Sequence, residues 1–308
     1  MRRWPPRSID LKPSLRDFLA LTKPTINLLV LVTGATALVL EGSLVERPGA
    51  FALVLLGLFL VAGCANALNQ YFERDIDARM KRTAKKRPLP SGRMSPRTAL
   101  VFATACGVLG VGIFAVFFNA FSALLGLGTI LFYSLFYTLY LKPRTPLNIV
   151  IGGAAGAMGP VIAWAAAAGA TPLLPWVLFA IIFFWTPPHF WSLAFCLKED
   201  YRAVSYPMMP NARGDAETMR QIVLYTLVTI AVTLAVPVMG GGVLGLVMAA
   251  GMGGYLLYRA LLMRRTNETR EAWGMFGYSI VYLLLLFVVF MVDATIDAPW
   301  NTLPLPGR

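Results

Sequence analysis

The chain has 308 residues, of which 57% are hydrophobic and only 14% are charged. A soluble domain of this length carries about a quarter charged residues, so the composition excludes an ordinary soluble protein and indicates an integral membrane protein. The net charge of +12 does not indicate a nucleic-acid partner, because the basic residues stand in short loops between apolar runs. That distribution reports the orientation of a protein in a membrane.

Nine apolar runs follow one another along the chain, each near the roughly 20 residues that cross a bilayer. They predict an all-α, polytopic membrane protein with nine transmembrane helices, in which the 98–141 and 220–263 regions each form a tight hairpin. The runs cover residues 24–42, 49–72, 98–118, 120–141, 147–168, 172–197, 220–239, 241–263 and 274–293.

Lysine and arginine alternate with the apolar runs in a way that predicts orientation. They crowd the N-terminal arm and every second loop, at 79–97, 142–144, 198–220 and 259–270, whereas the other loops hold only Arg47. By the positive-inside rule the N-terminus is cytoplasmic and the C-terminus is outside. We therefore expect a cytoplasmic arm over 1–22 with a short amphipathic piece near Leu15–Leu21, a transmembrane domain over 23–294, and an extracytoplasmic tail over 295–308.

The end of the second apolar run carries the most informative residues. Asn69, Glu73 and Asp77 are spaced four apart, which stacks them along one face of a helix with a drift of roughly 40° per step. Three oxygen-bearing side chains followed by basic residues suit a hard divalent cation that carries a phosphate group. A polar helix end at the membrane surface is the simpler interpretation, but Asn66 and Asn69 inside an apolar span favour a site. Asp75 points roughly 200° away from Glu73 and is assigned to a loop contact.

A second polar group surrounds His189, the only histidine of the chain. It lies inside the sixth apolar run, directly after Pro187 and Pro188, a pair that we expect to kink the helix. A lone histidine is often a hydrogen-bonded core residue, but an ionisable residue inside a membrane span indicates function. Lys198 and Asp200 follow at the cytoplasmic end of the same run, on the side of the membrane where Glu73 lies. The polar stretch 198–220 is long enough for a lid, and a solvated connector explains it equally well.

Two further stretches predict packing. The small residues from Gly152 to Gly159 give one span a smooth face, which favours a close helix–helix seam. Residues 131–140 form a dense aromatic stretch in which Phe132, Phe136 and Tyr140 share one face and Tyr133 and Tyr137 another. An aromatic belt at the membrane interface is the default interpretation. A pocket whose ring faces stabilise a carbocation is the sharper one.

The acidic segment, read together with nine spans, resembles the UbiA-type superfamily of intramembrane aromatic prenyltransferases. Within it, several segments resemble the protoheme IX farnesyltransferase (haem O synthase) family, and together they cover about residues 15–290. They are 21–24 (LTKP), 75–83 (DIDARMKRT), 87–90 (RPLP), 141–153 (LKPRTPLNIVIGG), 188–190 (PHF), 198–210 (KEDYRAVSYPMMP) and 279–283 (SIVYL). Two departures stand out: the segment 82–87 is one residue longer than the usual spacing, and Gly159 stands where a second proline is common.

The resemblance implies a helix bundle around a central cavity open to the cytoplasmic side, with farnesyl diphosphate and haem B as substrates and haem O and diphosphate as products. It implies that Asn69, Glu73 and Asp77 hold Mg²⁺ and act in catalysis together with His189, which ligates haem iron or orients the macrocycle. Arg82, either Lys86 or Arg87, and Lys198 as a third candidate are expected to bind the diphosphate oxygens. The other residues expected to bind substrate are Asn66, Asp200 and Tyr201. A second acidic segment of the superfamily is not legible here.

The resemblance also implies partners and a location. Besides the lipid bilayer, haem A synthase or cytochrome oxidase assembly proteins are expected partners. A bacterial plasma membrane is preferred over a mitochondrial one, because the N-terminal arm is short and carries Asp10 and Asp17.

Three other functions compete with haem farnesylation. The nearest is a sister prenyltransferase that acts on an aromatic quinone precursor. A transporter for haem or another anion is from a different class, but transporters gather ionisable groups near the midplane, whereas the charges here stand at the ends of spans. A purely structural assembly factor leaves the acidic residues unexplained.

Overall fold

The structure, a computed structural model, describes residues 13–296. Those residues form helices and turns, with no strand among them. Nine helical segments of the described chain are long and apolar enough to cross a membrane, which confirms the predicted all-α, polytopic fold.

The helices follow one another with short connections, and three of the spans, α2, α3 and α6, begin on a proline, whose fixed φ suits the first turn. α7 and the π-helix η1 together form one span, and α8 and α9 together form another. The bounds are α1 Leu15–Thr22, α2 Pro24–Glu41, α3 Pro48–Phe72, α4 Arg74–Asp77, α5 Lys81–Ala84, α6 Pro96–Phe117, α7 Ala120–Leu131, η1 Phe132–Leu141, α8 Asn148–Ala157, α9 Gly159–Ala168, α10 Leu173–Cys196, α11 Lys198–Ala203, α12 Met209–Val238, α13 Val243–Thr266 and α14 Thr269–Ile296.

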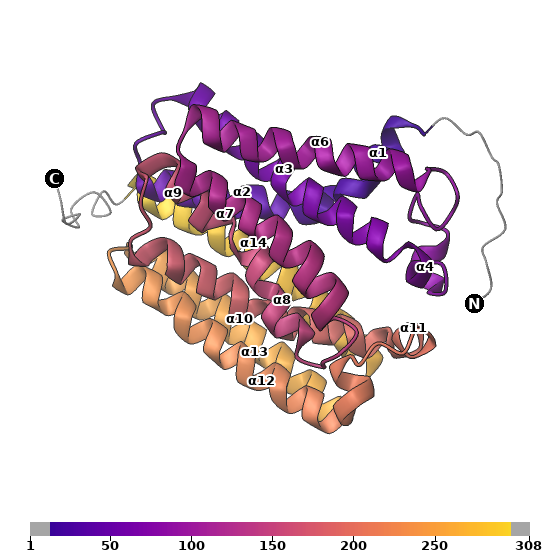
Figure 1. Ribbon diagram of the computed structural model, residues 1–308. Coiled ribbons are helices and arrows are strands. Elements are labelled where there is room, and N and C mark those ends of the chain that lie inside the picture. The colour runs from indigo at the N-terminus through magenta and orange to yellow at the C-terminus, as the bar shows by residue number, and fades with distance from the viewer. Residues whose placement is uncertain (1–12, 297–308) are drawn as a thin grey trace.

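The spans close into one bundle (Figure 1). Most consecutive spans pack against each other, and α2 also packs against α9 and α14, so that the first span meets the last. The Thr36 hydroxyl donates a 3.1 Å hydrogen bond to the carbonyl of Phe287 across this closure. The short helices α4 and α11 lie at the same end of the bundle, which we call the site end, while α14 finishes at the opposite end.

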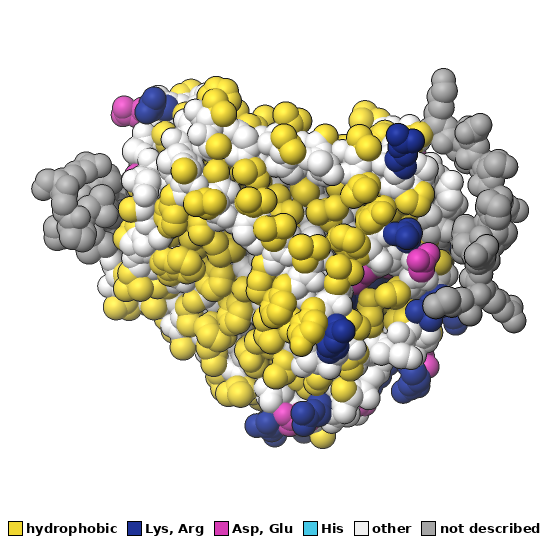
Figure 2. All heavy atoms as spheres, viewed as in Figure 1, with side chains coloured by type: hydrophobic (Ala, Val, Ile, Leu, Met, Phe, Trp, Pro, Cys, Tyr) yellow, Lys and Arg dark blue, Asp and Glu magenta, His cyan; other side chains and the backbone are white. Residues whose placement is uncertain are grey.

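The outer surface of the bundle is apolar between its two ends. Figure 2 shows a broad band of hydrophobic side chains, with lysine and arginine gathered mainly at the site end. Large side chains such as Val108, Val116 and Leu124 are more than half exposed in the absence of lipid, as expected for a lipid-facing surface. The loops that the sequence predicts to be cytoplasmic, because they are rich in lysine and arginine, lie at the site end (Figure 2).

The predicted small-residue seam is confirmed. Gly152 lies against the ring of Tyr137, where an added Cβ would come within 2.2 Å of a ring carbon, and Gly153 lies against Thr186. Gly159 begins α9 beside Val30 of α2. The span is interrupted at Met158, so the break occurs here with glycine in place of the second proline.

The prediction for residues 198–220 is wrong in its extent. Most of this stretch is helical, because α11 covers Lys198–Ala203 and α12 begins at Met209, eleven residues before the predicted span. Gly214 adopts φ 78°, a left-handed conformation that suits glycine, and it bends the chain inside α12. Polar residues in the first turns of α12 hid the helix in the sequence.

The predicted amphipathic piece of the arm is confirmed as α1, in which Leu15 and Leu19 are exposed and Leu21 is buried. The rest of the arm, residues 1–12, and most of the predicted tail, residues 297–308, lie outside the described residues. The boundaries drawn at residues 22 and 294 stay predictions.

Candidate active site

The acidic segment forms a buried carboxylate pair at the site end. Glu73 and Asp77 are each only 2% exposed, whereas Asp75 is exposed, as its predicted direction requires. The expectation of one continuous helix is wrong: α3 ends at Phe72, Glu73 has φ −90° and ψ 4°, and α4 begins at Arg74. A 2.8 Å hydrogen bond from the amide of Asp77 to the carbonyl of Glu73 keeps the two carboxylates adjacent through this break.

Cations from two other segments neutralise this pair. Lys142, just beyond η1, places its Nζ 2.5 Å from Oε1 of Glu73. Arg87 pairs with Asp77 and stands 3.9 Å from Oε2 of Glu73. The hydroxyl of Tyr206 donates a 3.2 Å hydrogen bond to Glu73. Two carboxylates from one segment are therefore held by side chains that come from three others, and this arrangement has no local sequence signature.

Asn69 completes the group one turn inside α3. Its Oδ1 accepts a 3.1 Å hydrogen bond from Nζ of Lys23, and its Nδ2 donates to the hydroxyl of Thr138 at 3.2 Å. Thr138 in turn donates to the carbonyl of Tyr133, five residues earlier, which is the spacing of a π-helix. Such irregular turns are frequent at functional sites, and here the turn presents Thr138 to Asn69. We call Asn69, Glu73 and Asp77, with Lys23, Arg87 and Lys142, the carboxylate site.

Burial and charge shift the pKa values in this site in opposite directions. For Glu73 burial acts to raise the pKa, but the charges of Lys142, Arg87 and Lys23 outweigh it and the pKa is lowered. For Asp77 burial dominates and the charge of Glu73 adds to it, so the pKa is raised despite Arg87. Burial, followed by the charge of Glu73, raises the pKa of Tyr206, which therefore keeps the proton that it donates.

The oxygen atoms of Asn69, Glu73 and Asp77 fit a magnesium ion. Mg²⁺ takes hard oxygen ligands, needs only one or two carboxylates from the protein, and keeps several waters or substrate phosphate oxygens. Within residues 13–296 no group of three or more His, Cys, Asp or Glu side chains is placed to hold a metal ion. The fit is thus to an ion that shares its coordination with a phosphate-bearing substrate, not to a closed protein cage.

An apolar cavity of about 110 Å³ begins one helical turn from Asn69. It lies between α2, α3, η1 and the α8–α9 span, and its wall includes Asn66, Tyr133 and Gly156. The amide of Asn66 donates to the carbonyl of Thr22 at 3.1 Å, so its nitrogen also ties α3 to the end of α1. Tyr133 and Tyr137 stack with ring centroids 5.2 Å apart, which confirms that they share a face.

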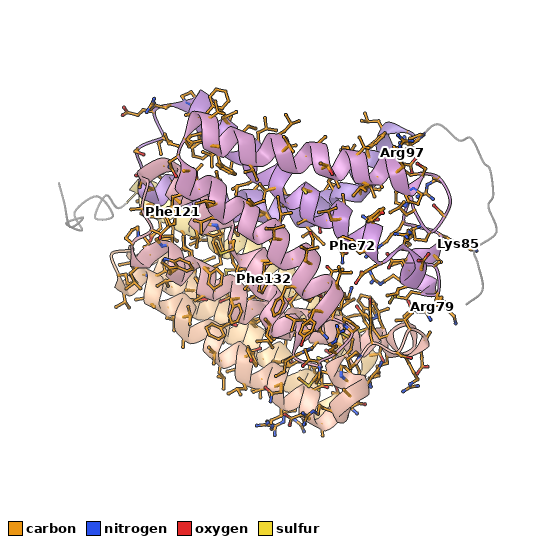
Figure 3. The ribbon with its side chains drawn as sticks, in the orientation of Figure 1. Phe72, Arg79, Lys85, Arg97, Phe121 and Phe132 are labelled. Atoms are coloured by element: carbon orange, nitrogen blue, oxygen red, sulfur yellow. The ribbon has the colours of Figure 1, made fainter. Side chains whose placement is uncertain are left out.

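Other predicted substrate-binding residues lie away from the carboxylate site. Arg82, Lys86, Lys198 and Asp200 line a separate open depression at the site end. Asp200 accepts a 3.0 Å hydrogen bond from the backbone amide of Arg82, and Lys198 pairs with Asp215. Tyr201 is buried in a small apolar cluster with Met80 and Tyr206. Of the alternatives Lys86 and Arg87, it is Arg87 that reaches the carboxylates. Figure 3 shows this end of the molecule, with Arg79 and Lys85 beyond Phe72.

His189 lies between α10 and α14 and contacts both helices. Its ring stacks on Trp185 and Phe276, with centroids 4.3 and 4.7 Å away, and its Nδ1 lies 2.7 Å from the hydroxyl of Ser279. Because that hydroxyl donates to the carbonyl of Phe276, we assign the shared proton to Nδ1, which leaves a lone pair on Nε2. α10 runs without interruption through Pro187 and Pro188. A single central cavity that joins His189 to Asp77 stays a prediction.

Sequence reasoning missed four residues of the carboxylate site or its contacts. They are Lys23, Lys142, Tyr206 and Thr138. Lys23 and Lys142 stand directly at the ends of apolar runs, on the side of the membrane predicted for Glu73, and that position was the signal that could have found them. Tyr206 and Thr138 are brought in by tertiary packing alone.

Comparison with known proteins identifies the family. The model of the UbiA prenyltransferase family matches residues 30–291. The chain belongs to the UbiA prenyltransferase family. Among its curated relatives within that family, the protoheme IX farnesyltransferase of Gloeobacter violaceus is 46% identical over 286 residues, which cover 92% of this chain and 93% of the relative. The protein of the same name from Thermus thermophilus is 46% identical over 282 residues, 91% of this chain but only 46% of the relative, so this chain spans about half the length of that protein. Both levels of the predicted resemblance are confirmed.

Solved structures show the UbiA fold at low sequence identity. Digeranylgeranylglyceryl phosphate synthase superposes with a TM-score of 0.74 at 17% identity, over 91% of this chain and 98% of that one. A UbiA homologue from Archaeoglobus fulgidus bound to DMAPP and Mg²⁺ gives a TM-score of 0.63 at 18% identity, over 90% and 99% of the two chains. The predicted UbiA-type bundle is therefore confirmed.

Proposed function

We propose that this chain transfers the farnesyl group of farnesyl diphosphate to a vinyl group of haem B, with addition of water, to give haem O and diphosphate. The carboxylate site is the observation that carries the proposal, because it combines buried acids, fixed cations and an adjacent apolar cavity. The name shared by the relatives supports haem as the acceptor.

The first step separates the leaving group from the prenyl chain. The bond between C1 of the farnesyl group and the diphosphate oxygen breaks, and its electron pair leaves with diphosphate. Lys23, Arg87 and Lys142 supply positive charge where negative charge develops. A magnesium ion held by Asn69, Glu73 and Asp77 would add to this neutralisation. When the substrate and its metal bind, the cations would turn from the carboxylates to the diphosphate. The carboxylates would then contact the metal.

The apolar cavity supports a binding site for the farnesyl chain at this place. It starts beside Asn66 and is walled by apolar side chains and the ring of Tyr133. A prenyl tail lying there would exclude water from C1 until the acceptor arrives. The face of Tyr133 would stabilise the allylic cation.

The second step joins the two substrates. The electron pair of the haem vinyl group forms a carbon–carbon bond to C1, and positive charge moves to the carbon next to the macrocycle. Water adds there and loses a proton to solvent, which leaves the hydroxyl group of haem O. The Nε2 lone pair that the assigned tautomer leaves on His189 would ligate the haem iron, or the stacked ring would orient the macrocycle.

We further propose that the protein resides in a bacterial plasma membrane with its site end in the cytoplasm. The basic residues gathered at that end support this orientation (Figure 2). Haem A synthase and cytochrome oxidase assembly proteins remain predicted partners.

Mass spectrometry of haems extracted from a host that lacks haem O tests the reaction. Expression of this chain should produce haem with a farnesyl and a hydroxyl group, and an empty vector should not. A prenylated benzoate or naphthoate, with haem B unchanged, would instead assign the chain to a sister prenyltransferase. If the protein is folded in the membrane and neither of these products is found, the proposed function is contradicted.

A further inference from the structure

The cations that the sequence predicts to bind the diphosphate fall into two groups in the structure. Arg87 joins Lys23 and Lys142 on the carboxylate site, whereas Arg82, Lys86 and Lys198 line an open depression of about 740 Å³. This basic depression lies between α5, the end of α10 with α11, and the turn from α13 into α14. Glu73 and Asp77 do not line it. None of its cations forms an ion pair with Glu73 or Asp77 in residues 13–296.

The acidic side chains of the basic depression are already engaged. Asp215 pairs with Lys198 at 2.5 Å, and Asp200 accepts a hydrogen bond from the backbone of Arg82. Glu199 forms an ion pair with the exposed Arg202 at 2.6 Å.

The basic side chains, in contrast, retain unused donors. Nε of Arg82 is buried and has no hydrogen-bond partner, although a buried N–H group left unpaired is costly. Lys81 and Lys86 are exposed and form no ion pair within residues 13–296. A guanidinium group with a free Nε–H, flanked by two ammonium groups, is suited to a carboxylate.

Two residues that line the basic depression stand on the helices that carry His189 and Phe276. Cys196 at the end of α10 and Thr269 at the start of α14 both line it. Seven residues deeper in the bundle along each helix lie His189 and Phe276, whose rings stack on each other. At 1.5 Å per residue this is about 10 Å in both helices. A ligand with anionic groups on one edge and a flat apolar body about 10 Å long matches this spacing.

We propose that the basic depression binds the propionate carboxylates of the haem substrate, with the macrocycle extending toward His189. The inference rests on the proposed function, since it concerns how the acceptor of that reaction is held. Arg82 is the principal partner, and Lys86 and Lys81 add charge at the rim. The two substrates then enter with their negative groups in separate sites at the same end of the bundle.

Haem B and its dimethyl ester, in which both propionates are blocked, distinguish this site. Both are titrated by absorbance into the purified full chain in phosphatidylcholine nanodiscs. R82Q should weaken binding of haem B roughly tenfold and K86Q by less, while neither changes binding of the dimethyl ester. R79Q and K85Q, which remove the same charge from exposed side chains outside the depression, should leave both affinities unchanged (Figure 3). Because the hydrogen bond to Asp200 comes from the backbone of residue 82, R82Q preserves it.

Equal affinity of the wild-type protein for haem B and its dimethyl ester would overturn the proposal, and so would a loss in R82Q that is the same for both. Loss of farnesyl thiodiphosphate binding in R82Q would show that Arg82 binds the diphosphate, and this result would also overturn the proposal. If R82Q instead releases phosphatidylglycerol from nanodiscs that contain it, with haem binding intact, the depression is a lipid headgroup site. Failure of the wild-type protein to bind any haem would count against the proposed function itself.

Discussion

Buried carboxylates lie at both ends of the bundle, and they are satisfied in different ways. At the end away from the site, Asp293 of α14 is fully buried and accepts hydrogen bonds from the backbone amides of Gly242 and Gly245, at 2.6 and 3.1 Å. These amides begin α13, so Asp293 caps that helix from another span. At the site end, Glu73 and Asp77 are held by Lys142 and Arg87.

The difference separates a structural carboxylate from an exchangeable one. Backbone amides at the start of a helix cannot move away, and Gly245 has no side chain that would separate it from Asp293. Lysine and arginine side chains are long and can turn to another anion without disturbing a helix. A buried acid paired with side-chain cations is therefore available to a metal and a diphosphate, whereas a buried acid on backbone amides is not.

The largest expected effect is on turnover when the exchangeable pair is neutralised. E73Q or D77N should lower the rate of haem farnesylation at least about 100-fold, because each removes a carboxylate that would face the metal. The shape of the side chain is kept, so the protein should still insert and fold. D75N, on the exposed neighbour, is the matched control and should retain activity. Normal turnover in E73Q and D77N, measured at equal membrane levels, would remove the carboxylate site from the mechanism.

Removing one of the cations should have a smaller effect. K142Q takes away the partner of Glu73 and a positive charge that would meet the diphosphate, so we expect turnover to fall about 10- to 100-fold. R144Q removes the same charge two residues later, from a guanidinium that stacks on the exposed ring of Tyr140. Single-turnover rates of the two variants provide the measurement. Similar rates in both would mean that net charge, and not the contact with Glu73, matters at this end.

Filling the apolar cavity tests whether the site end continues into a prenyl-chain site. An added Cβ at Gly156 meets no atom within 4 Å, so G156F should be accommodated by the fold while its ring occupies the cavity. We expect farnesyl transfer to fall about tenfold, with a rise in KM, since uniform binding of the chain is lost. G112F on α6, where an added Cβ also meets open space, should leave KM unchanged. An unchanged KM for farnesyl diphosphate in G156F would mean that the farnesyl group binds outside this cavity.

At the opposite end the expected effect is on stability. D293A leaves two amides at the start of α13 without an acceptor and should destabilise the bundle by about 1–2 kcal/mol. Asparagine also caps helices well, so D293N should recover part of this loss. Thermal unfolding in detergent measures it, and the turnover of the protein that remains folded should be normal. A variant that keeps its stability but loses turnover would contradict the structural role of Asp293.

The smallest effect concerns the contact that holds α1. Asp17 accepts hydrogen bonds from Ser14 and from Arg93, at 2.8 Å each, and although burial acts to raise its pKa, these bonds lower it. Because the pKa is depressed in the folded protein, the stabilisation is present above about pH 4, the unfolded pKa, and is lost as the pH falls through the folded value. R93Q should speed hydrogen exchange of α1 amides about twofold at neutral pH, consistent with about 0.5 kcal/mol. Below the folded pKa the two proteins should exchange alike, and a difference that persists there would exclude the ion pair as the cause.

The elements that the sequence predicted best are those with a signal inside one segment. Apolar runs located nine spans, and the four-residue spacing brought Asn69, Glu73 and Asp77 together even though α3 ends at Phe72. The partners of these residues come from segments far away in the chain, so spacing says nothing about them. Lys142 lies 69 residues from Glu73, and Tyr206 lies 133 residues from it.

The same limit explains where the structure departs from the sequence pattern. Arg82 and Arg87 are five residues apart, and both are expected to contact the diphosphate. In the structure Arg87 contacts Asp77, whereas Arg82 lines the open depression. Polar residues at the start of α12 resemble a loop by composition, and only tertiary packing makes them helical. Whether Asp77 and His189 share one cavity depends on several helices at once, which no single segment encodes.

Binding of farnesyl thiodiphosphate, which resists ionisation, tests the exchange of partners at Glu73 and Asp77 most directly. Calorimetry on the full chain in nanodiscs, with Mg²⁺ or with EDTA, gives the affinity in each condition. The account predicts tight binding that requires Mg²⁺ in the wild-type protein and in D75N, and loss of the Mg²⁺ dependence in D77N. Equal binding with and without Mg²⁺ in the wild-type protein, or an unaltered Mg²⁺ dependence in D77N, would contradict it.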